Sequence, residues 1–344
     1  MSLATRTLGR SNLKVTVLGF GTAPLGDLYA RLDDATAVAT VEAALAAGIT
    51  LLDTSPHYGN GLAEHRCGTA LRRHERSDVV LSTKVGRVMD PRQRPAAPAR
   101  SDVVSPGFAG GLPHKASFDY SYDGAMRSFE QSLLRLGTDR IDVLLIHDVD
   151  VWTHGADGIE ARFKEAMDGA YRALADLRDQ KVIKAIGVGI NEADMCERFA
   201  RAGDFDCMLL AGRYSLLEQP ALEGFLPLAQ EKNIGVMLGG VFNSGILATG
   251  AVPGARYNYA PAPDAVMDKV RRIEAVCRAH SVPLAHAALH FALGHPAVAS
   301  LVLGGVAPEE VSRNVAAFAA SPPAGLWSDL KSEGLLAPDA PTPA

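Results

Sequence analysis

Four polar side chains in the first half of the chain stand where apolar runs end, and their chemistry is that of proton transfer. Asp53 ends one such run and Tyr58 follows it, Lys84 ends the next, and His147 ends a third. If these runs are parallel strands of one sheet, their carboxyl ends bring a carboxylate, a phenol, an ammonium and an imidazole into one mouth. Each residue alone fits an ordinary structural role, so the prediction of a catalytic site rests on their convergence.

Together the four groups suit the interconversion of a carbonyl and an alcohol. A phenol titrates at about 10 in water, too high for a proton relay at neutral pH. Lys84 is expected to lower the pKa of Tyr58, while Asp53 keeps the ammonium charged and in place. Tyr58 then gives a proton to a carbonyl oxygen or takes one from an alcohol, and His147 hydrogen-bonds the same oxygen. The hydride must be exchanged with a cofactor.

Eight apolar runs, each followed by a helical stretch, must position these residues. The runs span 15–20, 49–53, 79–84, 141–147, 184–188, 207–210, 235–238 and 300–303. Helices are expected over 36–47, 63–73, 122–136 and 159–179, and near 192–202, 219–232, 264–280 and 308–319. Continuous aliphatic runs are typical of parallel strands buried on both faces. Eight such units favour an α/β fold of the (β/α)8 TIM barrel type over a doubly wound sheet, whose Gly-x-Gly-x-x-Gly motif is missing after the first run.

We expect a single domain over residues 1–344, with the barrel at about 15–320. The Pro-rich tail, 321–344, should hold a short helix at 326–334. Three connections are too long for simple turns, namely 86–121, 148–158 and 239–263. All three follow the carboxyl ends of strands, where barrels assemble their active sites. Because loops of this length are usually functional in compact domains, we expect them to hold the substrate.

The composition excludes several classes of protein. The 34 Lys and Arg residues against 39 Asp and Glu give a net charge of −5 without a basic block, which argues against nucleic acid as a partner. The longest apolar run, around 143–146, is too short to span a membrane, and the polar N-terminus does not resemble a signal peptide. The cysteines are scattered without a Cys-x-x-Cys pair. We therefore expect no metal site and a cytoplasmic enzyme with a small-molecule substrate.

Several segments resemble the signature of the aldo-keto reductase superfamily. They are 48–59 (GITLLDTSPHYG), 82–84 (STK) and 144–147 (LLIH), and residues 8–11 and 18–22 resemble the N-terminal β-hairpin and first strand of that family. The resemblance runs from about residue 5 to 320. It implies a (β/α)8 barrel, a nicotinamide dinucleotide as cofactor, no metal, and a catalytic tetrad of Asp53, Tyr58, Lys84 and His147.

The resemblance also implies an extended dinucleotide across the mouth of the barrel. The residues expected to contact it are Gly21, Thr22, Asp53, Asn191, Phe242, Asn243, Gly304, Gly305, Val306, Glu310 and Asn314. Backbone N–H groups of 304–306 would face the pyrophosphate at a helix N-terminus. One residue is inserted before Asn191 relative to the family pattern. Segment 239–245 also departs from that pattern, so Phe242 would supply the ring that stacks on the nicotinamide.

Two departures bear on the choice between NAD and NADP. Gly304 and Glu310 stand where many family members place a Lys or Arg that binds the 2′-phosphate. A phosphate requires cationic partners, whereas a glutamate suits a free ribose hydroxyl. We therefore expect NAD to be preferred, with NADP still possible because Arg313 lies nearby.

The long loops and the tail resemble one branch of the superfamily, which contains D-threo-aldose 1-dehydrogenases, also active on L-fucose, and pyridoxal 4-dehydrogenases. Both oxidise a hemiacetal or aldehyde-derived carbon to a lactone. The expected reaction is oxidation of an aldose at C1, and pyridoxal oxidation or general aldehyde and ketone reduction are the alternatives. Sugar hydroxyls would meet polar and aromatic side chains, for which the candidates are His57, Asp148, Trp152 and Asn243.

Two readings from other classes stay open. One is a barrel without catalytic activity that serves as a regulatory subunit. The function of such a subunit would not require the hydroxyl group of Tyr58. The other is a Schiff-base lyase with Lys84 as its nucleophile, although the Asp–Lys pair argues against it because the amine would stay protonated.

Overall fold

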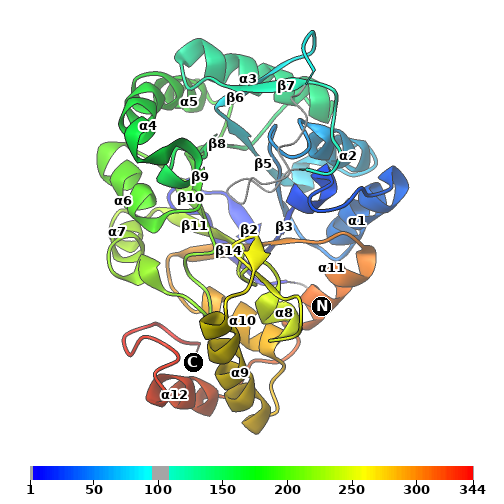
Figure 1. Cartoon of the computed structure of the whole chain (residues 1–344). Helices are drawn as coiled ribbons and strands as arrows, with labels where there is room; N and C mark the ends of the chain where they lie inside the picture. The colour runs from blue at the N-terminus through cyan, green and yellow to red at the C-terminus, as the bar shows by residue number, and fades with distance from the viewer. Residues whose placement is uncertain (1–2, 95–107, 344) are drawn as a thin grey trace.

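The computed structural model describes residues 3–94 and 108–343 and contains a closed barrel of eight parallel strands with helices around it (Figure 1). The strands follow one another around the barrel in chain order, namely β3 (Leu18–Gly21), β4 (Leu51–Asp53), β5 (Val80–Val85), β8 (Val143–His147), β9 (Ala185–Ile190), β10 (Cys207–Ala211), β11 (Gly235–Gly239) and β14 (Val298–Gly304). β14 pairs with β3 and closes the ring. The predicted (β/α)8 barrel is therefore confirmed.

The barrel strands are buried on both faces, and successive residues pack in two separate apolar clusters. In β8, Val143 and Leu145 belong to the cluster inside the barrel, whereas Leu144 and Ile146 belong to the cluster between sheet and helices. This is the two-residue period of a strand. It explains why the strands read as unbroken apolar runs rather than as alternating ones.

Most of the predicted helices are present within a few residues of their expected bounds. The helices that surround the barrel are α1 (Asp34–Ala46), α2 (Leu62–Leu71), α3 (Tyr122–Leu136), α4 (Val151–Glu165), α5 (Tyr171–Asp179), α6 (Ala193–Ala202), α7 (Phe225–Glu231), α9 (Asp264–Ala279), α10 (Leu284–Leu293) and α11 (Pro308–Ala316). The sequence did not predict α10, because its residues (LAHAALHFAL) are apolar on nearly every side and six of them are buried. Such a segment lacks the polar face by which a surface helix is recognised.

All three predicted loops contain regular structure. The connection expected over 148–158 is helical from Val151, where the Asp150 side chain caps α4 by accepting from the Thr153 N–H. Gly155, with φ 71° and ψ 162°, interrupts that helix. The apolar residues on the two sides of Gly155 therefore do not follow one continuous helical period, and the sequence showed no sign of a helix before residue 159. A π-helical turn, Ala166–Ala170, joins α4 to α5.

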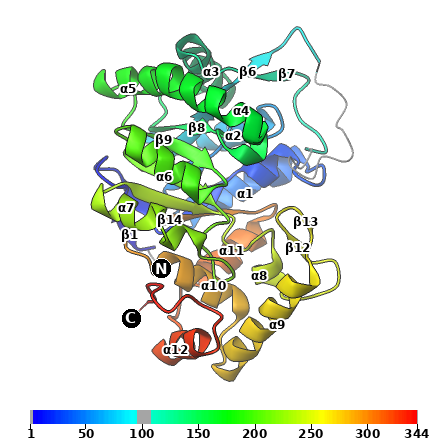
Figure 2. The same cartoon turned by 60° about the vertical axis from the view of Figure 1, so that its left-hand side comes forward.

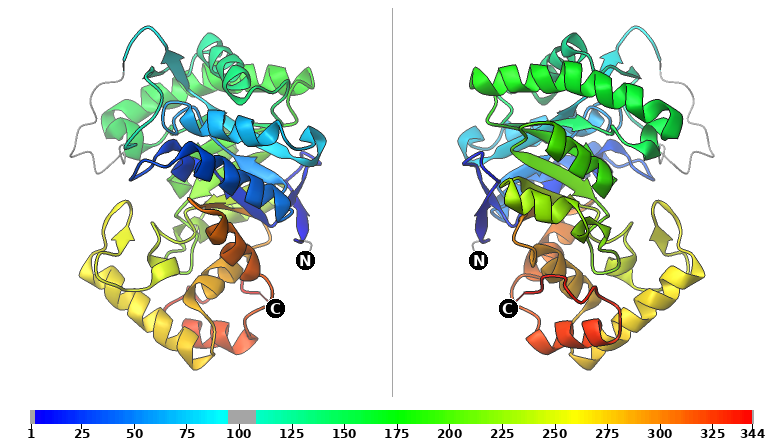
Figure 3. Two further views of the ribbon diagram at one scale, coloured as in Figure 1. Left: turned by 90° about the vertical axis from the view of Figure 1, so that its right-hand side faces the viewer. Right: turned by 90° about the vertical axis from the view of Figure 1, so that its left-hand side faces the viewer.

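The first long loop, 86–121, carries an antiparallel hairpin of β6 (Arg87–Asp90) and β7 (Lys115–Phe118). Residues 95–107 of that loop lie outside the described residues. The third loop holds the short helix α8 (Ile246–Thr249) and a small hairpin of β12 (Arg256–Tyr257) and β13 (Ala260–Pro261). Both hairpins project from the same end of the barrel (Figure 3).

The opposite end of the barrel is covered by the N-terminal hairpin of β1 (Thr5–Thr7) and β2 (Lys14–Thr16) (Figure 3). Leu8, Leu13 and Val15 from this hairpin join the cluster inside the barrel. The predicted first run, 15–20, is thus split between the hairpin and β3.

The tail forms α12 (Ala324–Ser332), close to the helix expected over 326–334, and packs beside α9 (Figure 2). Its Leu326, Trp327 and Leu330 are buried in the outer apolar cluster. No helix in residues 3–94 or 108–343 is long and apolar enough to cross a lipid bilayer.

Candidate active site

The two-residue period of the strands aims the predicted catalytic side chains into the barrel mouth. Asp53 lies two residues beyond Leu51, and His147 two beyond Leu145, and both leucines belong to the cluster inside the barrel. The register of β5 against β8 pairs Lys84 with Leu145. Residues two apart on a strand share a face, so these side chains continue the inner layer of the barrel where it meets the cavity.

Lys84 is held in a buried ion pair at the base of the site. Its Nζ lies 2.6 Å from Asp53 Oδ2 and donates to the Thr54 carbonyl at 2.7 Å. The other oxygen of Asp53 accepts from Ser82 Oγ at 2.8 Å. Lys84 is 1% exposed, so both charges are shielded from water. Their mutual attraction therefore fixes the geometry of the site.

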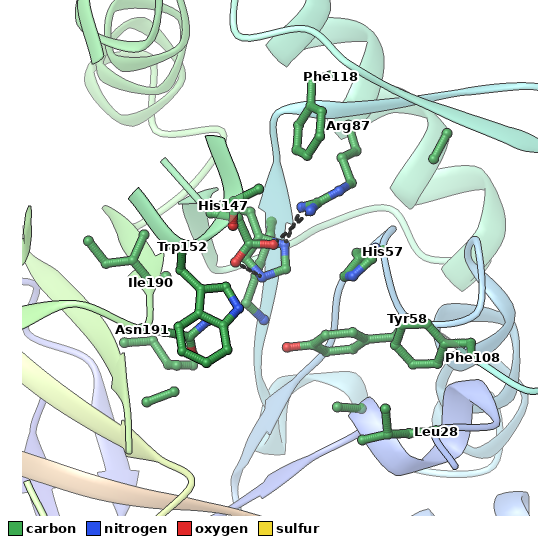
Figure 4. A pocket seen from close by; sticks show the side chains of 18 of the residues that line it. Leu28, His57, Tyr58, Arg87, Phe108, Phe118, His147, Trp152, Ile190 and Asn191 are labelled. Carbon is green, nitrogen blue, oxygen red and sulfur yellow. Dashed lines mark hydrogen bonds and ion pairs between the residues drawn. The ribbon is translucent and has the colours of Figure 1, made fainter. Parts of the chain in front are cut away.

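Tyr58 lies over this pair and reaches into the cavity (Figure 4). Its ring centroid is 4.9 Å from Lys84 Nζ and 6.0 Å from the ring centroid of His147, which it meets edge to face. The structure thus brings all four tetrad residues of the sequence prediction together in one place.

His147 is held from both ring nitrogens. Its Nδ1 lies 3.1 Å from Ser55 Oγ and 3.3 Å from Arg87 Nη1, and its Nε2 lies 3.3 Å from Asp148 Oδ1. A guanidinium only donates, so Nδ1 accepts and the ring proton lies on Nε2. Burial, followed by Arg87 and Lys84, lowers the pKa of His147 well below its usual value. The imidazole is therefore neutral at neutral pH.

The pKa values of Tyr58 and Lys84 correct one expectation. Burial is the largest influence on Tyr58 and raises the pKa of its phenol above the ordinary value, while Lys84 acts in the opposite direction without outweighing it. The sequence prediction of a lowered phenol pKa was wrong because it left out burial. For Lys84, burial alone lowers the pKa, but Asp53 and Tyr58 raise it above its ordinary value. An amine with a raised pKa stays protonated at neutral pH and is then a poor nucleophile, which disfavours a Schiff-base mechanism.

Two cavities meet at Tyr58. The first, of about 650 Å³, extends towards the β6–β7 hairpin and is lined by His57, Lys84, His147 and Asp148, among others. The second, of about 530 Å³, runs along the carboxyl ends of β10, β11, β14 and β3 towards α11. Tyr58, Trp152 and Asn191 line both. Because the phenol stands where they join, a compound in one cavity can react with a group in the other.

The second cavity collects most of the residues predicted to hold a dinucleotide. Those that line it are Gly21, Asp53, Asn191, Phe242, Asn243, Gly304, Gly305, Val306 and Glu310. Of the predicted residues that the structure describes, Thr22 and Asn314 lie outside the lining of both cavities. The Val306 N–H already donates to Glu310 Oε2 at 2.9 Å, so it is not free for a pyrophosphate.

The shape and the polar groups of the second cavity also fit a dinucleotide. Gly212 and Gly245 line it with positive φ, and a Cβ at either would meet no atom within 4 Å, so bare backbone borders open space there. The Oγ1 of Thr22 is buried without a hydrogen-bond partner among the described residues, between Gly21 and Ala23 of the lining. The N-terminus of α11 lies at the far end, where backbone N–H groups favour anions.

Three of the four residues predicted to meet the substrate line the first cavity, namely His57, Asp148 and Trp152. Asn243 does not. It lines the second cavity, and its Oδ1 accepts from Ser215 Oγ at 2.5 Å. Among the residues described, no cluster of His, Cys, Asp and Glu could hold a metal ion.

Sequence reasoning missed several residues of the site. Arg87, Phe108 and Phe118 line the first cavity, Arg213 lines the second, and Tyr259 lines both. Arg87 could have been found, because it stands three residues beyond Lys84 at the start of a loop already assigned to the mouth. The others lie in loops whose course the pattern of strands and helices does not determine.

Comparisons with known proteins agree with this geometry. The model of the aldo/keto reductase family matches residues 17–330. The chain is 44% identical to the pyridoxal 4-dehydrogenase of Microbacterium luteolum, over 96% of this chain and 97% of that protein. It is 38% identical to the D-threo-aldose 1-dehydrogenase of a Pseudomonas species, over the full length of both. The holo structure of an aldo-keto reductase from Bacillus halodurans superposes with a TM-score of 0.74, at 25% identity, over 97% of each chain. The chain therefore belongs to the aldo/keto reductase family, whose oxidoreductases use NAD or NADP.

Proposed function

We propose that the protein oxidises the C1 carbon of an aldose of the L-fucose or D-threo type to its lactone, with NAD as the preferred cofactor. The observation that carries this proposal is the position of Tyr58 above the buried Asp53–Lys84 pair, at the junction of the two cavities. The charged and polar side chains of the first cavity, among them Arg87, His147 and Asp148, suit the hydroxyl groups of a sugar. The proposal is also supported by the relative at 38% identity, which is a D-threo-aldose 1-dehydrogenase.

The residues of the site would divide the work in the following way. A nicotinamide dinucleotide bound in the second cavity would supply the hydride acceptor. Tyr58, as phenolate, would take the proton of the anomeric hydroxyl, and the Lys84 ammonium would stabilise the negative charge on the phenolate. When substrate binds, the Nε2–H of neutral His147 would exchange its contact with Asp148 Oδ1 for the same substrate oxygen and orient that oxygen. Asn191 and Phe242 would hold the cofactor near Tyr58.

A second candidate, the oxidation of pyridoxal to 4-pyridoxolactone, is favoured by two observations. The relative at 44% identity is a pyridoxal 4-dehydrogenase. The first cavity also has aromatic walls, formed by Tyr58, Phe108, Phe118 and Trp152, which suit a flat ring. Both candidates oxidise a cyclic hemiacetal, so the same proton transfer serves either.

NADH formation from a panel of substrates tests the proposal. L-fucose, D-arabinose, L-galactose and pyridoxal are each supplied with NAD+ and with NADP+. We expect the highest kcat/KM for an aldose with NAD+. A response to pyridoxal alone would support the second candidate, and reduction of simple aldehydes without oxidation of any of the four would support a general reductase.

The Glu310 carboxylate should set the preference for NAD. It lines the second cavity beside the α11 N-terminus and bonds the Val306 N–H, where a 2′-phosphate would meet like charge. Replacing Glu310 with Arg is expected to raise the ratio of kcat/KM for NADP+ over NAD+ by about tenfold or more, since a charge-assisted hydrogen bond contributes about 1.5–3 kcal/mol. Glu309→Arg, at an exposed neighbouring position outside the lining, is the matched control. An equal change in both variants would point to net charge alone.

The raised pKa of Tyr58 predicts opposite pH profiles for the two directions. The phenol is protonated at neutral pH, so it serves as the acid for reduction there, and reduction should decline only on the alkaline side. Oxidation needs the phenolate, so its kcat/KM should rise through the neutral and alkaline range. Steady-state rates in both directions over this range are the measurement, and an oxidation rate that is independent of pH would contradict the role of Tyr58 as base.

Two further expectations concern the chain as a whole. We infer that the activity resides in one barrel domain, at about 15–320, with the tail packed on α9. We infer a cytoplasmic location from four buried thiols without disulfides, namely Cys67, Cys196, Cys207 and Cys277.

A further inference from the structure

The buried ion pair of Arg87 and Asp148, which flanks His147, also lines the first cavity. Arg87 Nη2 lies 2.8 Å from Asp148 Oδ2, and both side chains are about nine-tenths buried. Figure 4 shows Arg87 above His147, opposite the Tyr58 hydroxyl across the cavity. The pair borders the space into which the reacting carbon must enter.

Both members of the pair are held rigidly. The Arg87 guanidinium lies over the Phe118 ring at 4.4 Å from its centroid, and its carbonyl accepts from Ser128 Oγ at 2.9 Å. Asp148 has a left-handed backbone with φ 56°, and its N–H donates to the Gly189 carbonyl at 3.0 Å. A left-handed residue other than glycine is tolerated where its surroundings hold it in place, and such residues cluster at functional sites.

The chemistry of the pair suits a neutral hydroxyl group. The guanidinium has five N–H donors and the carboxylate has four lone-pair positions, of which the contacts to each other and to His147 use only some. A hydroxyl both donates and accepts, so one hydroxyl can donate to Asp148 and accept from Arg87 at the same time. An anionic group would gain less, because the charge of Arg87 is already balanced by Asp148.

The pair lies next to the position of the reacting oxygen. Asp148 Oδ1 is 3.3 Å from His147 Nε2, the atom that would donate to that oxygen. A substrate whose reacting oxygen bonds Nε2 therefore has the pair directly beside that oxygen, within reach of a hydroxyl on the neighbouring carbon. The 2-hydroxyl of an aldose and the ring hydroxyl of pyridoxal both stand close to the oxygen that is oxidised.

We propose that the Arg87–Asp148 pair binds a second hydroxyl of the substrate beside the reacting oxygen, and thereby makes the enzyme selective for hydroxylated substrates. This inference rests on the proposed function. An analogue without that hydroxyl would leave the buried donors and acceptors of the pair unmatched, which is the arrangement that gives strong discrimination.

The test compares each substrate with its deoxy analogue: L-fucose with 2-deoxy-L-fucose, and pyridoxal with 3-deoxypyridoxal. The quantity measured is the ratio of kcat/KM within a pair, which does not depend on the amount of folded enzyme. We expect a ratio of at least about a hundredfold for the unmodified enzyme, and at least about a tenfold smaller ratio in Arg87→Met and Asp148→Asn. The pair of compounds with the larger ratio identifies a sugar or a pyridoxal-like compound as the source of the hydroxyl.

Arg135→Met is the matched control. It breaks another buried ion pair, Arg135 Nε to Glu64 Oε2 at 2.6 Å, that lies outside the lining of both cavities, so it should leave the ratio unchanged. If Arg87→Met and Asp148→Asn slow a substrate and its deoxy analogue equally, the inference is wrong while the proposed function stands. If no hydroxylated compound yields NADH, both are wrong.

Discussion

Tyr58→Phe is expected to lower kcat by about three orders of magnitude in both directions, because the ring remains and only the proton-transferring hydroxyl is lost. The ring packs against Phe108 at 6.2 Å between centroids and lies over Lys84, and phenylalanine keeps both contacts. Dinucleotide binding, followed by quenching of protein fluorescence, and the melting temperature should therefore stay close to those of the unmodified enzyme.

A second tyrosine of the site provides the control for this substitution. Tyr259 lines both cavities, whereas the ring that lies over Lys84 Nζ is that of Tyr58. Tyr259→Phe should lower kcat by less than about tenfold, because the loss of one ordinary hydrogen bond changes a free energy by only about 1 kcal/mol. If Tyr58→Phe kept most of its dinucleotide-linked activity, another group would be the proton donor and the assignment of the tetrad would fail.

Lys84→Met should abolish most activity and also destabilise the fold. Removal of the ammonium leaves the Asp53 carboxylate buried without a cation, a change that costs about 3–5 kcal/mol for buried pairs. It also withdraws the charge that stabilises the phenolate of Tyr58. We expect a lower free energy of unfolding in urea together with a fall in kcat of at least about a hundredfold.

The double variant Lys84→Met with Asp53→Asn separates the two effects. A neutral amide at position 53 can still accept from Ser82 and leaves no unpaired charge. Stability should therefore return towards that of the unmodified enzyme, while the activity stays lost. If Lys84→Met alone were as stable as the unmodified enzyme, the ion pair would contribute nothing to the fold, contrary to its burial.

The barrel and the location of its catalytic end could be predicted because they depend on short-range patterns. Each strand appears as an unbroken apolar run, and the polar residue after it marks the mouth. The period of two then aims Asp53, Lys84 and His147 inward without further information. Helix α10 was missed for a related reason, because burial on nearly all sides removes the pattern that identifies a helix.

The contacts within the mouth could not be predicted in the same way. Arg87 and Asp148 are 61 positions apart and meet because β5 pairs with β8 in a register that sets Val85 beside Ile146, two residues before each of them. Asn243 was expected at the substrate, but the chain places it on the second cavity with its side chain bonded to Ser215. Such contacts depend on strand register and on loop conformations, which no local period encodes.

The amino-acid sequence by itself determined the number of strands in the barrel, the two-residue period that points Asp53, Lys84 and His147 inward, and the chemical types of the four groups. Only the tertiary structure decided their protonation and their neighbours. Burial raises the pKa of Tyr58 although Lys84 lies close by, and Arg87 places the proton of His147 on Nε2. The reason is that desolvation and long-range contacts depend on how many atoms surround a group in space, which the order of residues along the chain does not state.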